Sequence, residues 1–181
     1  MKILVLYGST RRGGNSDQLA GRLVAGLPRT EVYLSEQQIK PIVDQRHDPE
    51  GFTPVDDDYD AIVEQVLEHD VLVFATPLYW YGMSAPMKLF VDRWSQSLRD
   101  KRYDFKTALR QKRVLVVVTG GDNPRIKGLP LIQQFTYIFD FVGMEFAGYV
   151  IGEGNKPGDV LLDERALDEV RWLRTSLQTT P

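Results

Sequence analysis

Cysteine is absent from the 181-residue sequence. This absence excludes disulfides, iron–sulfur clusters, zinc sites built from thiolates and a cysteine nucleophile. It fits a cytoplasmic protein, and because the sequence opens directly on an apolar run, no signal peptide is expected. Histidine is scarce: His47 lies in a polar stretch and His69 precedes an apolar run. We expect His69 to interact with a helix dipole, and we expect no metal site.

The sequence also lacks a charge excess and a long hydrophobic run. The formal net charge is -3, which gives no electrostatic reason to bind nucleic acid or an anionic membrane. No apolar run approaches the ~18 residues that a membrane helix needs. The length suits one domain, residues 1–181, with a proper hydrophobic core.

Five short apolar runs, most of them rich in β-branched residues, predict strands. The run at 114–118 is the most hydrophobic and is expected inside the sheet, whereas 30–34 is the weakest. The five predicted strands span 3–7, 30–34, 71–75, 114–118 and 145–151.

Helical spacing of apolar residues separates these runs. The predicted helices begin at Asn15, after Asp56-Asp57-Asp58 as N-cap candidates, and at Ser84 as an N-cap. Two more follow, over 131–142 with a stop at Gly143, and over 166–177. Trp94 and Trp172 fall at helical spacing and are expected in the core or at an interface. Two segments show no clear period and are expected as a long loop and a polar connection, 35–55 and 98–112.

Apolar strands that alternate with helices predict a doubly wound α/β fold, a parallel sheet covered on both faces. For five strands we expect the order 2-1-3-4-5. Ligands of such sheets bind beyond the carboxyl ends of the strands, at the point where the strand order reverses. The loops after strands 1, 3 and 4 are therefore the candidate site.

The loop after the first strand, residues 8–16, reads Gly-Ser-Thr-Arg-Arg-Gly-Gly-Asn-Ser and opens a helix. Helix N-termini carry unpaired N–H groups and partial positive charge, and both favour a phosphate. The loop has neither the nucleoside-triphosphatase pattern nor the G-x-G-x-x-G spacing of dinucleotide folds. An ordinary strand-to-helix turn is the alternative. The candidate phosphate ligands are Ser9, Thr10, Arg11, Asn15 and Ser16.

The loop after the third strand has three consecutive aromatic residues. A flat ligand would cover them; alternatively the loop folds back on the core or packs at a subunit interface. The candidate residues are Pro77, Leu78, Tyr79, Trp80, Tyr81 and Gly82. The loop after the fourth strand offers Thr119, Gly120 and Gly121, where the backbone can approach a ligand closely, although a plain turn is the alternative.

Together the loops provide a phosphate anchor, a flat apolar wall and backbone donors, which FMN requires. The segments at 8–16, 76–93 and 119–121 resemble the flavodoxin-like NAD(P)H-dependent FMN reductases, near the iron–sulfur-flavoprotein and multimeric-flavodoxin branch. The resemblance spans nearly the whole chain and implies a flavodoxin-like three-layer fold. Within the signature at 76–93, Asp92 and Arg93 are expected to form a structural or interface ion pair. The chain departs from related proteins that carry a cysteine cluster near 40–55.

By this resemblance, Ser9, Arg11, Asn15 and Ser16 hold the phosphate of FMN. Pro77, Leu78, Tyr79, Trp80 and Gly82 line the flavin ring, and Thr119, Gly120 and Gly121 face its pyrimidine end. The implied activity is hydride transfer from NADPH or NADH through FMN to a small-molecule acceptor: a quinone, a nitro- or azo-aromatic, free flavin or a ferric chelate. No side chain is expected as an essential acid or base. Tyr79, Trp80 and Tyr81 are expected to stack on nicotinamide or acceptor.

Two alternatives remain. A flavodoxin-type electron carrier without pyridine-nucleotide activity would share the fold, but such carriers are usually far more acidic. A non-flavin phosphate binder or a receiver-like domain is the other, although a receiver would need an Asp where this chain has Ala75-Thr76-Pro77. The exposed aromatic loop and the resemblance both favour a homodimer or homotetramer.

Overall fold

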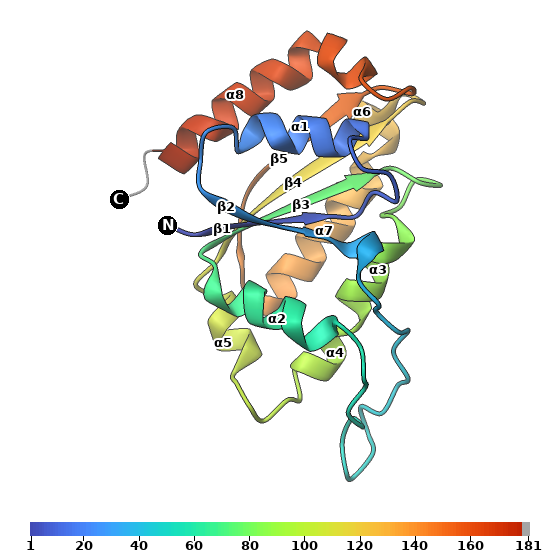
Figure 1. Ribbon diagram of the computed structural model, residues 1–181, viewed down its shortest axis with the longest axis vertical. Coiled ribbons are helices and arrows are strands. Elements are labelled where there is room, and N and C mark those ends of the chain that lie inside the picture. The colour runs from blue at the N-terminus through green and yellow to red at the C-terminus, as the bar shows by residue number, and fades with distance from the viewer. Residues whose placement is uncertain (179–181) are drawn as a thin grey trace.

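A parallel sheet forms the centre of the computed structural model, which describes residues 1–178 (Figure 1). The strands pair in the order β2-β1-β3-β4-β5, and every pairing is parallel. The predicted fold and strand order are therefore confirmed. The strands are β1 (Ile3–Tyr7), β2 (Arg29–Tyr33), β3 (Val71–Pro77), β4 (Arg113–Gly120) and β5 (Glu145–Glu153).

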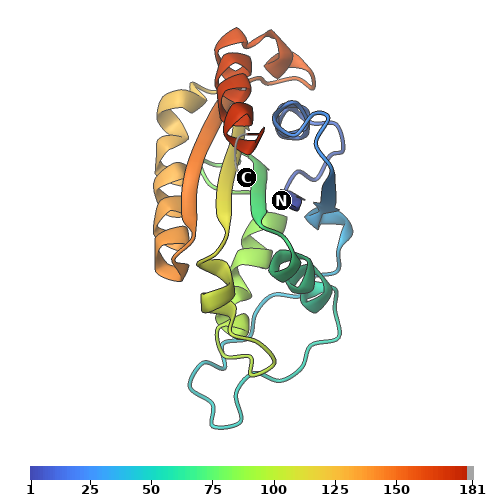
Figure 2. The same cartoon turned by 90° about the vertical axis from the view of Figure 1, so that its left-hand side faces the viewer.

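Helices cover both faces of the sheet (Figure 2). One layer contains α1 (Asn15–Leu23), η2 (Asp159–Leu162) and α8 (Glu164–Gln178). The other layer contains α2 (Tyr59–Glu68), α3 (Ala85–Asp92), α4 (Trp94–Ser97), α5 (Phe105–Leu109) and α7 (Leu129–Val142). Two short helices follow β2 and β4: η1 (Leu34–Glu36) and α6 (Pro124–Lys127).

Alternation along the strands explains the two layers. In β1, Ile3 and Val5 pack under α1 and α8, whereas Leu4 and Leu6 pack toward the opposite layer. Both faces of the strand are thus buried, as its continuous apolar run predicts. None of the described helices is long and apolar enough to cross a membrane.

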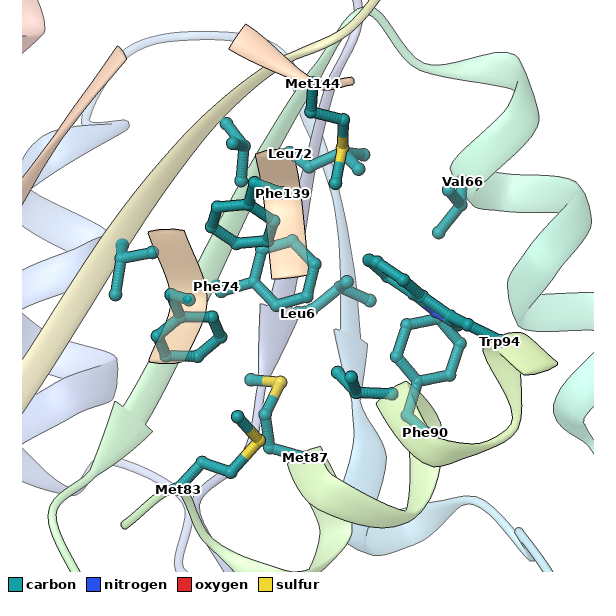
Figure 3. Close-up of a cluster of buried hydrophobic side chains, with 14 of the residues drawn as sticks. Leu6, Val66, Leu72, Phe74, Met83, Met87, Phe90, Trp94, Phe139 and Met144 are labelled. Carbon is teal, nitrogen blue, oxygen red and sulfur yellow. The ribbon is translucent and has the colours of Figure 1, made fainter. Parts of the chain in front are cut away.

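An aromatic cluster supports the loop after β3 (Figure 3). The ring of Phe74 in β3 lies 5.3 Å from Phe139 of α7 and 6.2 Å from Trp94, centroid to centroid. Met83 and Met87, where α3 begins, are buried in the same cluster. The loop after β3 therefore leaves and re-enters the fold at well-packed points. Trp94 is in the core, whereas Trp172 on α8 is exposed and does not join the core.

Two sequence predictions need correction. The segment 98–112 is more than a polar connection, because Phe105 and Leu109, one helical turn apart, are buried and form α5. Asp104 caps this helix by accepting the Thr107 N–H at 3.0 Å. The helix predicted from Ser84 through Trp94 ends at Asp92, and Trp94 begins α4.

Predicted capping residues occupy the N-cap positions of α2 and α3, but their side chains bind elsewhere. The carboxylate of Asp58 accepts the Gln38 N–H at 2.7 Å in the long loop. The hydroxyl of Ser84 donates to the Gly8 carbonyl at 2.6 Å. Ser84 therefore joins the loop after β1 to the loop after β3. At the end of α7, Gly143 has a φ of 79°, which is the predicted left-handed stop.

His69 lies at the C-cap of α2, as expected, and its ring contacts a carbonyl in the last turn of that helix. Both ring nitrogens of this buried residue bond locally, Nδ1 with the Gln65 carbonyl at 2.6 Å and Nε2 with the Thr30 hydroxyl at 2.8 Å. His69 thus fastens the end of α2 to β2.

Candidate functional site

An open pocket of about 380 Å³ lies at the carboxyl ends of the strands, next to the switch point between β1 and β3. Ten of the predicted site residues line it: Ser9, Arg11, Asn15, Ser16, Pro77, Leu78, Tyr79, Thr119, Gly120 and Gly121. Four do not: Thr10, Trp80, Tyr81 and Gly82. Gly14, Gly154, Asn155 and Pro157 complete the lining.

The loop after β1 is shaped by its own hydrogen bonds. The buried hydroxyl of Ser9 accepts the Arg11 N–H at 3.1 Å and donates to the Arg11 carbonyl at 2.8 Å. The carboxylate of Asp17 accepts the Gly13 N–H at 3.0 Å. The Gly14 N-cap of α1 makes no side-chain cap hydrogen bond, and Gly14, Asn15 and Ser16 at the start of this helix line the pocket.

The two arginines of this loop have different surroundings. Arg12 pairs with Glu36, and its guanidinium lies 3.8 Å from the centre of the Tyr33 ring. Tyr33 in turn stacks on Tyr7 at 4.5 Å. Arg11 lines the pocket, and within residues 1–178 its guanidinium has no ion-pair or hydrogen-bond partner. Arg11 is therefore the cation available to an anion in the pocket.

Asp17 places an acidic group beside the same helix end. Burial raises the pKa of its carboxyl, although hydrogen bonds from Gly13, Ser16 and Gly14 oppose the shift. An acid at this position holds the loop but also adds negative charge near an anion site.

The loop after β3 ends in a tight hairpin turn. Tyr79 and Gly82 exchange backbone hydrogen bonds of 3.0 Å in both directions. The two residues between them, Trp80 and Tyr81, have φ values of 47° and 62°. Positive φ at both central positions is the signature of a type I′ turn, which normally requires Gly, Asn or Asp. Trp80, at the tip of this turn, is 96% exposed.

The loop after β4 approaches the pocket with its backbone. Leu78 donates its N–H to the Thr119 carbonyl at 2.7 Å, so this loop and the aromatic loop are hydrogen-bonded. A Cβ at Gly121 would lie 3.0 Å from both Cβ and Oδ1 of Asn155. Glycine therefore allows the loops after β4 and β5 to touch.

Sequence reasoning missed the loop after β5, which supplies Gly154, Asn155 and Pro157 to the pocket. A signal was present, because 154–158 reads Gly-Asn-Lys-Pro-Gly directly after a strand. All five carboxyl strand ends lie at one edge of a parallel sheet, so this loop was a candidate on the same grounds as the others.

Asp92 and Arg93 do not pair with each other. Asp92 binds Lys88 at 2.5 Å on the surface of α3. Arg93 is buried and donates to the Asp57 carboxylate at 2.7 Å and to the Lys40 carbonyl at 3.0 Å. The structural ion pair expected for Arg93 exists, but its partner is Asp57, which lies just before α2.

A profile of proteins with a flavodoxin-like fold matches residues 1–174. The Bacillus subtilis (strain 168) protein named "Putative NAD(P)H-dependent FMN-containing oxidoreductase YwqN" is 57% identical over 92% of this chain and 93% of its own length. The FMN-dependent NADH:quinone oxidoreductase of Leptothrix cholodnii is 28% identical over 84% of this chain and 85% of its own. The solved structure of Trp repressor binding protein from Bacillus subtilis superposes with a TM-score of 0.81 and 49% identity, covering 94% of this chain and 96% of that one. With nearly the whole chain matched, this protein belongs to the family with a flavodoxin-like fold.

Proposed function

We propose that this chain is an FMN-dependent oxidoreductase that takes a hydride from NAD(P)H and delivers it to a small-molecule acceptor. The observation that carries the proposal is the pocket, which combines an uncapped helix N-terminus, an apolar wall and a glycine-rich loop. A relative that is 57% identical is named for this activity.

The lining residues suit the parts of FMN. The start of α1 and the unpaired Arg11 suit the phosphate, with Ser9 and Ser16 beside them. Pro77, Leu78 and Tyr79 suit a flat apolar ring, and the backbone of the lining residues Thr119, Gly120 and Gly121 suits its polar edge. The residues present therefore fit the group.

When bound, FMN supplies two-electron chemistry between NAD(P)H and an acceptor. The chain contributes binding and orientation. Backbone N–H groups near Gly120 and Gly121 would stabilise negative charge on the polar edge of the cofactor, because they are preorganised donors. No lining side chain is required as a proton donor or acceptor in this scheme.

The aromatic turn is proposed to face the second substrate. Trp80 stands at its tip, beyond the lining of the pocket, where it can stack on nicotinamide or on a flat acceptor such as a quinone. The same exposure suits burial against a second copy, and we propose a homodimer or homotetramer. Light scattering with size-exclusion chromatography tests the oligomer: a monomeric mass would contradict it.

The remaining expectations stay predictions. They are one FMN-binding domain over 1–181, a cytoplasmic location, and the absence of nucleic-acid and membrane partners.

The function is tested by adding FMN to the purified protein, desalting it, and recording absorbance anaerobically before and after NADPH or NADH. We expect flavin bands that are retained and then bleached, and reoxidised by a quinone. Retained bands that neither nucleotide bleaches would instead indicate an electron carrier. A protein that shows no flavin binding by titration would contradict both.

A further inference from the structure

The loop after β5 is built into the pocket by hydrogen bonds from three directions. The Gly154 N–H donates to the Gly120 carbonyl at 2.9 Å. The carboxylate of Asp159 accepts the N–H groups of Asn155 at 3.1 Å and Lys156 at 2.7 Å. The third group of hydrogen bonds joins the side chain of Asn15 to Lys156 and Gly158. The conformation of residues 154–158 is therefore imposed by the fold around it.

Asn15 uses its side-chain amide on this loop. Its Nδ2 donates to the Lys156 carbonyl at 2.9 Å, and its Oδ1 accepts the N–H groups of Gly158 at 2.9 Å and Val160 at 3.4 Å. A Cβ at Gly154 would lie 2.8 Å from Nδ2, so glycine is needed for the contact. An amide that serves three backbone groups is occupied as a connector between the loops after β1 and β5.

Asn155 is in the opposite situation. Its side chain lies against Gly121 on the lining of the pocket, and among residues 1–178 its amide has no hydrogen-bond partner. An Asn amide is both donor and acceptor. It suits a ligand group that carries both, such as a sugar-alcohol hydroxyl or the edge of a pyrimidine ring.

We propose that the loop at 154–158 is a fourth cofactor-binding segment, in which Asn155 binds the part of FMN that lacks the phosphate. Asn15 is then a positioning residue, which acts through the loop and not on the phosphate. This inference rests on the function proposed above. It assigns to Asn15 a role different from the phosphate ligand that the family resemblance implies.

The test compares dissociation constants of FMN and riboflavin, measured by quenching of flavin fluorescence. The variants are Asn155→Ala, Asn15→Ala and the double variant, with Leu162→Ala on the exposed surface of η2 as control. We expect each single change to weaken both flavins about fivefold to tenfold, which is the size of one lost hydrogen bond. The double variant should bind no more than about twofold weaker than the weaker single variant, since Asn15 acts through the loop that carries Asn155. The control should match the unaltered protein.

Three outcomes contradict the inference. If Asn15→Ala weakens FMN but not riboflavin, Asn15 is a phosphate ligand. Effects that add in the double variant mean that the two residues act independently. If Asn155→Ala binds both flavins normally, the loop at 154–158 is not a cofactor-binding segment. Because Asn155 is exposed, this variant decides the question even if Asn15→Ala fails to fold. An unaltered protein that binds neither flavin would overturn the proposed function itself. Faster hydrogen exchange at Gly158 and Val160 in Asn15→Ala supports the positioning role without any flavin.

Discussion

The phenol of Tyr81 donates a hydrogen bond of 2.8 Å to the carboxylate of Asp122, and so joins the turn after β3 to the loop after β4. Lys127 donates to the same carboxylate oxygen at 2.5 Å. The Lys127 and Tyr81 hydrogen bonds lower the pKa of Asp122. The Trp80 side chain is almost fully in solvent and cannot anchor the turn. The hydrogen bond of its neighbour Tyr81 therefore holds the turn in place.

Removing the Tyr81 hydroxyl should raise the KM for the electron acceptor and leave the binding of FMN unchanged. For Tyr81→Phe we expect the KM for a quinone to rise at least about twofold, a modest loss for one neutral hydrogen bond. The flavin dissociation constant should stay unchanged. The matched control is Tyr137→Phe, which removes an exposed phenol from α7. Steady-state kinetics with varied quinone decide the matter, and an unchanged KM would mean that the bond does not orient the turn.

Glycine at position 80 should relax the turn while it removes the stacking group. Trp80→Gly relieves a positive φ, so the free energy of unfolding should rise by up to about 1 kcal/mol, while turnover of an aromatic acceptor falls. The control is Trp172→Gly, which changes an exposed Trp inside α8 and should lose roughly 0.5 kcal/mol, the difference in helix propensity between Trp and Gly. Urea denaturation compares the two, and equal losses would show that the turn is not strained.

The two arginines of the loop after β1 should separate phosphate binding from loop stability. Arg11→Ala should weaken FMN by about tenfold or more and leave riboflavin unchanged, because it removes an unpaired charge from the pocket. Arg12→Ala should have a smaller effect on FMN, since that guanidinium is committed to Glu36 and Tyr33. Flavin titrations measure both, and a larger effect from Arg12 would reverse the assignment.

Arg93 should be among the most sensitive structural positions. Both side chains of the Arg93–Asp57 pair are 1% exposed, so Arg93→Met leaves an unpaired buried carboxylate and should cost about 3–5 kcal/mol of unfolding free energy. The exposed Lys88–Asp92 pair is the control, and Lys88→Met should cost at most about 0.5 kcal/mol. Similar costs in chemical denaturation would contradict a structural role for Arg93.

Asp17 should destabilise the fold at neutral pH. Burial raises its pKa above the usual 3.8, so the penalty develops as the pH rises through 3.8 toward the folded-state pKa and is complete at pH 7. Asp17→Asn keeps an acceptor for Gly13, and its gain in stability should be largest at pH 7 and shrink toward pH 4. Denaturation of this variant and of the exposed control Asp48→Asn checks the sign, and a loss at pH 7 would show that the charge itself is needed.

The strands, the main helices and the loops that meet at the switch point could all be predicted from the amino-acid sequence. Burial on both faces of a strand leaves a continuous apolar run, as at 3–7, and burial of one helix face leaves a period, as at 131–142. Both signals are carried by neighbouring residues and can be read locally. Local reading failed for α5, where two buried residues are too few to show a period.

The partners of the loop side chains, in contrast, depend on contacts between segments that are far apart in the sequence. Asn15 and Lys156 are 141 positions apart, and their contact exists because the parallel sheet brings the ends of β1 and β5 to one edge. Arg11 and Arg12 are neighbours of identical chemistry, but the fold places Glu36 and Tyr33 beside Arg12 alone. Such partners are set by packing between distant segments, and no local pattern records them.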